Sequence, residues 1–264
     1  MPKQEGIFKF KGTLQGRCYY QLNGEYVVRK AVGPSSERIN TDPAFVNVKG
    51  NNQEFTAATQ LSKAIRRGLG ATGKAFQDTY MASRLTGRCR KVIQKGSGAL
   101  GEREANLFNN PNAIIGFPLK KDLPFQQIYT AKAVVNSNTN RSIITINIPK
   151  SEQYNHNQIP ENATHFQLTA ALSTVSNSAW QPNKNEYITE YLNDNALGVT
   201  VHSQPLLCKI EHHNISLQLQ SPNTNNTPTH VAQTIWLGIT YLKQQHNALG
   251  ILKTAQAMEC IAVI

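Results

Sequence analysis

Six basic side chains are candidates for contacting a polyanion: Arg66, Arg67, Arg84, Arg88, Lys91 and Lys95. The last four follow the spacing i, i+4, i+7 and i+11, so they share one face of a predicted helix. Asp78 is the only carboxylate between Lys63 and Lys95. Such a face could track phosphates, and each contact would release counterions. The alternative is a solvated helix face opposite the core.

Two segments match the glycine pattern GxGxxG, at residues 68–73 and 96–101. In a dinucleotide-binding fold this pattern follows a buried strand and opens a helix beside the pyrophosphate. Here each copy follows a basic helical stretch instead. We therefore expect the first glycine of each, Gly68 or Gly96, to end a helix and the remaining residues to form a flexible joint.

Other residue types that support catalysis lack the spacing that catalysis requires. The seven histidines form no ligand set, and the adjacent His212 and His213 would point to opposite faces of a strand. The 16 Asp and Glu show no paired motif, and no Ser, Cys or His lies in a recognisable nucleophile context. We predict no enzyme, no metal site and no cofactor.

The positive charge is concentrated in the first 110 residues. They contain 18 Lys and Arg against eight Asp and Glu, whereas residues 111–264 contain nine against eight. A field of this kind attracts nucleic acid, an anionic membrane or an acidic protein surface. A basic face that only aids solubility is the alternative.

The four cysteines are far apart and show no CxxC spacing, which indicates reduced thiols: Cys18, Cys89, Cys208 and Cys260. The first residues contain no apolar stretch typical of a signal peptide. No run of about 18 apolar residues predicts a membrane span. We expect a cytoplasmic protein.

Residues 7–30 predict a β-hairpin that turns at Asn23-Gly24. Thr41-Asp42-Pro43 is typical of a helix start, Gly50-Asn51-Asn52 interrupts that helix, and Gln53 resumes it. Its apolar residues recur at helical spacing: Phe55, Ala58, Leu61, Ile65 and Leu69. A second helix is predicted at about 74–95, with an apolar side formed by Phe76, Tyr80, Met81, Leu85, Cys89 and Val92.

Strands dominate the chain after residue 118. Four are predicted at 143–148, 165–170, 215–219 and 235–241, and three more at 126–135, 198–202 and 258–264. Several alternate apolar and polar residues, as half-buried antiparallel strands do. We predict an α+β protein with a basic hairpin-plus-helices region at 1–110 and an antiparallel immunoglobulin-like β-sandwich at 118–264.

Several segments look like parts of one family: residues 7–16, Ser36-Glu37-Arg38, residues 41–45 and, near the other end, residues 237–241. The chain resembles a family of uncharacterised Bacteroidota proteins that have a basic N-terminal segment and a β-sandwich. The interruption predicted at Gly50-Asn51-Asn52 departs from the family's pattern. The resemblance implies no known activity, and therefore no catalytic or binding residues.

Two functions fit these observations. The first is a non-enzymatic structural or assembly protein that self-associates, as a homo-oligomer, or docks on another protein through its basic N-terminal region. The second is a nucleic-acid-binding protein that contacts phosphates through the basic helices, although aromatic residues suited to base stacking are few among them.

Overall fold

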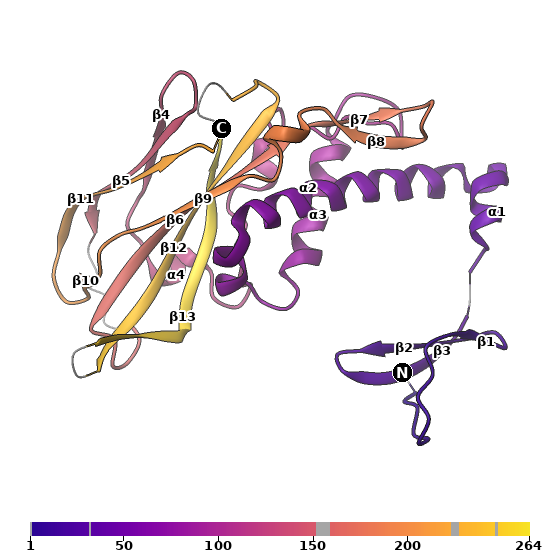
Figure 1. Cartoon of the computed structure of the whole chain (residues 1–264), viewed down its shortest axis with the longest axis horizontal. Helices are drawn as coiled ribbons and strands as arrows, with labels where there is room; N and C mark the ends of the chain where they lie inside the picture. Colours follow the sequence, from indigo (N-terminus) through magenta and orange to yellow (C-terminus); the bar gives the residue numbers. More distant parts are fainter. Residues whose placement is uncertain (1, 32, 152–158, 223–226, 246–247) are drawn as a thin grey trace. The chain divides into compact units, whose positions relative to one another are not determined.

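The computed structural model describes residues 2–31, 33–151, 159–222, 227–245 and 248–264. Its contacts divide the chain into two compact units, residues 1–49 and residues 50–264 (Figure 1). We call them unit 1 and unit 2. The division by contacts therefore falls at a different place from the change in charge near residue 110, and the basic helices belong to the same unit as the C-terminal strands.

Unit 1 contains a small antiparallel sheet and two short helical segments: β1 (Gly12–Leu14), β2 (Arg17–Leu22), β3 (Glu25–Lys30), α1 (Ser36–Thr41) and the 3-10 helix η1 (Pro43–Phe45). The turn between β2 and β3 uses Asn23 and Gly24 with φ values of 50° and 85°, which suits a two-residue hairpin and confirms the predicted hairpin. Asp42 accepts a hydrogen bond of 3.0 Å from the Ala44 N–H and caps η1 rather than a long helix.

The helical segments after η1 are α2 (Val46–Phe76), α3 (Met81–Gln94), η2 (Pro111–Ala113), α4 (Phe125–Ile128) and η3 (Leu192–Asp194). The strands of unit 2 are β4 (Val134–Ser137), β5 (Ile143–Ser151), β6 (His165–Ser176), β7 (Ser178–Gln181), β8 (Glu186–Thr189), β9 (Gly198–His202), β10 (Leu206–Leu207), β11 (His212–Gln220), β12 (Val231–Gln245) and β13 (Ala248–Val263). No helix in the described part of the chain combines the length and the apolar character needed to cross a membrane.

Two antiparallel sheets form the body of unit 2. The larger has the order β10-β6-β12-β13, with β9 also paired to β6, and the smaller has the order β11-β5-β4. A shared core lies between them, in which Leu217 of β11 is paired with Ile146 of β5 and both are buried. These sandwich-like sheets, together with the helices, confirm the predicted α+β class.

A second core covers the other face of the larger sheet. Along β12, Ile235 and Leu237 belong to the core between the sheets, whereas Trp236 belongs to the core shared with α2 and α3. Trp236 is fully buried and packs edge-on against Phe117, with ring centroids 6.4 Å apart. Side chains on both faces of β12 are therefore buried. The strand is not half-buried, because helices cover the face that would otherwise meet water.

Several predicted boundaries are wrong. Gly50 does not interrupt α2 but lies inside it, where Leu100 packs closely against the helix: a Cβ there would lie 3.0 Å from Leu100 Cγ. The second helix begins at Met81, not near residue 74. Residues 126–135 begin within the single turn α4 and reach a strand only at Val134. Two side chains expected on apolar helix faces, Phe55 and Tyr80, are exposed.

The first glycine motif brings α2 against the sheet. Gly68 lies inside α2, and a Cβ on it would lie 2.1 Å from Ser173 Oγ and 2.6 Å from the Leu197 carbonyl oxygen. On the sheet side, a Cβ on Gly198 would lie 1.8 Å from the Gly68 carbonyl oxygen. The two backbones touch where neither residue has a side chain, so Gly68 is a packing glycine and not a helix end.

We expect Gly68→Ala to lower the free energy of unfolding by about 2 kcal/mol or more, because overpacking outweighs the roughly 1 kcal/mol that alanine adds to helix propensity. Gly87→Ala in α3 is the matched control, because nothing lies within 4 Å of the added Cβ. That control should leave stability unchanged or raise it. Urea unfolding measures both, and equal midpoints for the two variants would contradict the close contact.

Candidate polyanion-binding surface

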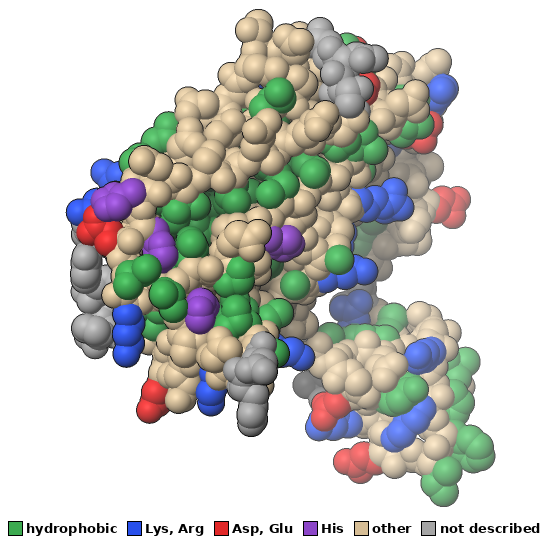
Figure 2. All heavy atoms as spheres, turned by 60° about the vertical axis from the view of Figure 1, so that its left-hand side comes forward, with side chains coloured by type: hydrophobic (Ala, Val, Ile, Leu, Met, Phe, Trp, Pro, Cys, Tyr) green, Lys and Arg blue, Asp and Glu red, His purple; other side chains and the backbone are tan. Residues whose placement is uncertain are grey.

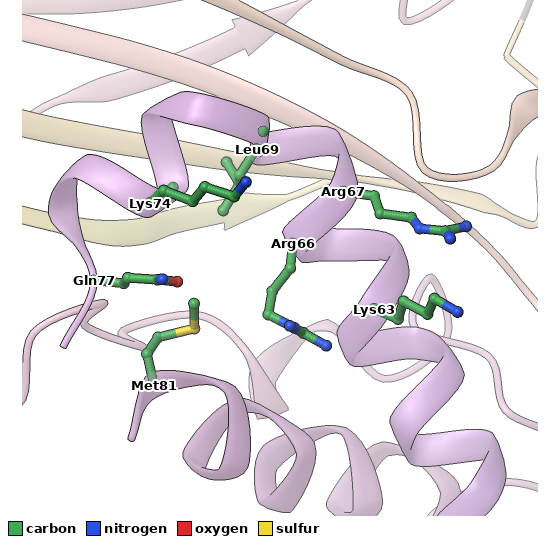
Figure 3. A pocket seen from close by; sticks show the side chains of 9 residues that line it. Lys63, Arg66, Arg67, Leu69, Lys74, Gln77 and Met81 are labelled. Atoms are coloured by element: carbon green, nitrogen blue, oxygen red, sulfur yellow. The ribbon is translucent and has the colours of Figure 1, made fainter. Parts of the chain in front are cut away.

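A cavity of about 430 Å³ lies between the end of α2 and the start of α3 (Figure 3). We call it the basic cavity. Four cationic residues line it: Lys63, Arg66, Arg67 and Lys74. The rest of the lining is neutral and consists of Leu69, Gly70, Gly73, Gln77 and Met81. No Asp or Glu is among these residues, so the cavity has one sign of charge.

The four cations lie on α2, on either side of a break in this helix at Gly70. Lys63, Arg66 and Arg67 have the spacing i, i+3 and i+4, which places them as neighbours on the surface of α2. At Gly70 the backbone leaves helical geometry, with φ 52° and ψ −129°, and then resumes the helix. Glycine adopts a positive φ at little steric cost. Lys74, which follows the break, lines the same cavity.

Arg66 occupies the inner position. Its side chain reaches into the space between α2 and α3, and Gln77 and Met81 extend into the same space (Figure 3). Its Nε atom is buried and has no hydrogen-bond partner. Leaving a buried donor unpaired costs about 1–3 kcal/mol. The Nε atoms of Arg84 and Arg90 are buried without a partner as well, so this feature by itself does not distinguish the cavity.

None of the four cations is neutralised within the described residues. Ion pairs with carboxylates form elsewhere in that part of the chain, and none includes Lys63, Arg66, Arg67 or Lys74. The nearby thiol of Cys89 provides no negative charge either. Burial raises the pKa of this thiol to about 12, although the positive charge of Arg66 acts in the opposite direction. Neither a carboxylate nor a thiolate among the described residues therefore offsets the positive charge of these side chains.

Arg84 is engaged inside the fold. Its guanidinium donates to Asp78 Oδ2 at 2.7 Å and to the carbonyl oxygens of Pro118 and Leu119 at 3.1 and 3.0 Å. It also lies 5.0 Å from the centroid of the Phe117 ring. These contacts fasten the segment after η2 to α3, so the structure places Arg84 in packing rather than on an open polyanion surface.

The remaining three predicted cations lie on α3 or at its end. Arg88 is half-buried, Lys91 and Lys95 are exposed, and none of them lines the basic cavity. The six predicted residues thus divide among an inner cavity, an internal network and an outer helix face. The prediction omitted Lys63 and Lys74, which lie on opposite sides of the break at Gly70, so helical spacing alone does not relate their positions.

Both glycine motifs follow helical rather than strand structure, as predicted. The second begins at Gly96, directly after Lys95, the C-cap residue of α3. Within the described residues no group of three or more His, Cys, Asp and Glu is placed to hold a metal ion. All four cysteines are free thiols, and three of them are buried.

No family model matches this sequence, and no curated protein is significantly similar to it. The resemblance to the Bacteroidota family therefore stays a prediction.

The Asp78–Arg84 pair gives a pH-dependent contribution to stability. Burial raises the pKa of the Asp78 carboxyl, but hydrogen bonds from the Lys121 and Tyr80 N–H groups and the charge of Arg84 outweigh it, so the pKa lies below 3.8. A depressed folded-state pKa stabilises the fold above the unfolded-state value, and this contribution is lost as the pH falls through the folded-state pKa.

We therefore expect Asp78→Asn to lower the melting temperature at pH 7 by several degrees, and the difference from wild type to shrink as the pH falls below 3.8. Asp122→Asn removes the same charge at an exposed position nearby and is the control. Thermal unfolding monitored by circular dichroism measures both. A pH-independent difference would show that the carboxylate charge is not involved.

Proposed function

We propose that this chain is a non-enzymatic assembly protein that associates with a second copy of itself through unit 1. The observation that carries the proposal is the lack of a core in unit 1. Val27, which is 4% exposed, is its one buried hydrophobic residue among those described. Large apolar side chains remain in water instead, including Ile7 at 96% and Phe8 at 80% exposure.

A unit of this size needs support from elsewhere. Below about 70–80 residues a single core rarely supplies more than about 3–5 kcal/mol, and small domains add disulfides, metals or oligomerisation. The cysteine of unit 1, Cys18, is a free thiol, and no metal-binding group exists among the described residues. Burial of the exposed apolar side chains against a second copy of the chain would supply such support.

One face of the unit 1 sheet combines apolar and basic residues. Strand register places Leu14, Arg17 and Lys30 side by side, next to Tyr19. Phe10 packs edge-on against Tyr19, with ring centroids 5.9 Å apart. In Figure 2 hydrophobic side chains gather at one edge of the smaller body, among Lys and Arg side chains. Such a face suits an acceptor with an apolar centre and an acidic rim.

Unit 2 carries a patch of that chemistry. Leu192 is 72% exposed in η3, and Glu190 and Asp194 lie on either side of it in the sequence. The negative charges of both carboxylates act on Tyr191, and that of Glu190 is the largest influence raising the pKa of this phenol. A local acidic patch with an exposed leucine supports a second copy of this chain as the acceptor.

We expect the full chain to form an oligomer whose mass depends on concentration in sedimentation velocity experiments. The variant Ile7→Ser/Phe8→Ser should weaken self-association at least tenfold, and so should Leu192→Ser on the acceptor side. Ile251→Ser is the matched control, because this residue is 58% exposed and lies on β13, outside both surfaces. A strict monomer at high concentration, or equal effects from the control, would overturn the proposal.

A second candidate function is contact with nucleic-acid phosphates through the outer face of α3. The sequence of α3 contains no Asp or Glu, and Arg88, Lys91 and Lys95 form no ion pair within the described residues. Three unneutralised cations at i, i+3 and i+7 could follow a phosphate backbone.

We expect low-salt gel shifts with duplex and single-stranded DNA to report this function. Arg88→Ala/Lys91→Ala/Lys95→Ala should remove binding and leave the melting temperature nearly unchanged. Arg84→Ala should instead lower the melting temperature, because it breaks the pair with Asp78. If the wild-type protein does not retard either DNA at low salt, the proposed contact with nucleic-acid phosphates is wrong.

A further inference from the structure

We infer that the basic cavity binds a small anion with two or more linked phosphoryl groups, either as inorganic polyphosphate or as part of a nucleotide. The inference does not depend on the proposed assembly function, because unit 1 contributes none of the residues that line the cavity. Three features of the cavity carry it: charge, donor geometry and size.

The charge favours a polyvalent anion over a monovalent one. Lys63, Arg66, Arg67 and Lys74 surround one space, and no carboxylate lines it. Like charges that share a partly enclosed space repel each other more strongly than in bulk water, because the effective dielectric constant is lower. A ligand with several negative charges relieves more of this repulsion than chloride or a single carboxylate.

The donors suit phosphoryl oxygens. Guanidinium groups offer planar, paired N–H donors that match phosphate, and lysine adds a mobile point charge. The Arg66 side chain reaches into the space between α2 and α3 (Figure 3). Gln77 extends an amide into the same space, whereas Lys63 and Arg67 project from α2 on the side away from Gln77 and Met81 (Figure 3). A ligand that contacts both the inner donors, Arg66 and Gln77, and the outer cations must be longer than a single phosphate.

The size and lining favour a small molecule. A volume of about 430 Å³ lies within the range of small-molecule sites, roughly 300–1,000 Å³. Gly70 and Gly73 leave the wall without side chains, and Leu69 and Met81 supply an apolar surface. The outer cations of α3 do not line this space, so a nucleic-acid strand that follows them would not need the cavity. Because no carboxylate lines the cavity, we expect binding that does not require a divalent cation.

Isothermal titration of the full chain at low salt tests the inference. The probes are inorganic triphosphate, ATP, adenosine and a single-stranded oligonucleotide, each without and with magnesium. We expect triphosphate to bind with micromolar affinity, adenosine not to bind, and magnesium not to strengthen binding. ATP binding tighter than triphosphate would identify a nucleotide site, and equal or weaker ATP binding would identify a polyphosphate site.

Variants of single cations locate the ligand. Arg66→Gln and Lys74→Gln should each weaken triphosphate binding at least tenfold, and Arg66→Lys should have a smaller effect because it keeps the charge. Lys91→Gln, which removes the same charge outside the cavity, should change the affinity less than twofold. Lys74 is exposed, so its variant keeps the test valid if Arg66→Gln fails to fold.

Three results would overturn the inference. The first is the absence of triphosphate binding below millimolar concentration. The second is an equal loss of affinity in Lys91→Gln and in the cavity variants, which would indicate nonspecific attraction to the basic helices. The third is that the oligonucleotide is the only one of the four probes that binds. None of these results bears on self-association, which sedimentation measures separately.

Discussion

The contact between the backbones of Gly68 and Gly198 sets how closely α2 approaches the larger sheet. At this point helix and strand meet without side chains between them. Ser173 of β6 also faces the helix, and a Cβ on Gly68 would collide with its hydroxyl group. The close approach allows α2 and α3 to seal one face of the sheet while the smaller sheet seals the other. The central strand β12 is therefore buried on both faces, as strands covered by helices usually are.

The same constraint shapes the basic cavity. Gly68 holds α2 against the sheet, and the helix breaks two residues later at Gly70. The side of α3 that includes Leu85 and Cys89 is buried in the same core. Both helices are anchored by their apolar sides, and the cations of α2 line a space that no carboxylate lines.

The two units differ in how they obtain stability. Unit 2 has two hydrophobic cores and contains many buried aliphatic and aromatic side chains. Unit 1 has an ordered hairpin, and Val27 is the one buried hydrophobic residue among those described in it, whereas large apolar side chains such as Ile7 and Phe8 are exposed. The proposed self-association and the proposed anion binding involve different units and share no residues.

Local features of this protein were determined by the sequence alone. The Asn23-Gly24 turn, the main strands from 143 to 264 and the basic helical stretch all follow from neighbouring residues, because turn dihedrals and residue periodicity are short-range properties. The concentration of charge before residue 110 is composition, and Arg66 and Arg67 were recognised as site candidates from it.

Only the tertiary structure decided what those features do. The sequence pattern predicts a helix end at Gly68. In the fold, Gly198, 130 positions away in the sequence, packs against it. By its spacing Arg84 belongs to a basic helix face, but in the fold it donates hydrogen bonds to the carbonyl oxygens of Pro118 and Leu119. Lys74 follows the break in α2 at Gly70, so only the folded chain shows that it lines the same cavity as Lys63. Each of these outcomes depends on contacts or backbone dihedrals that periodicity does not encode, since residue spacing describes one element and not what packs against it.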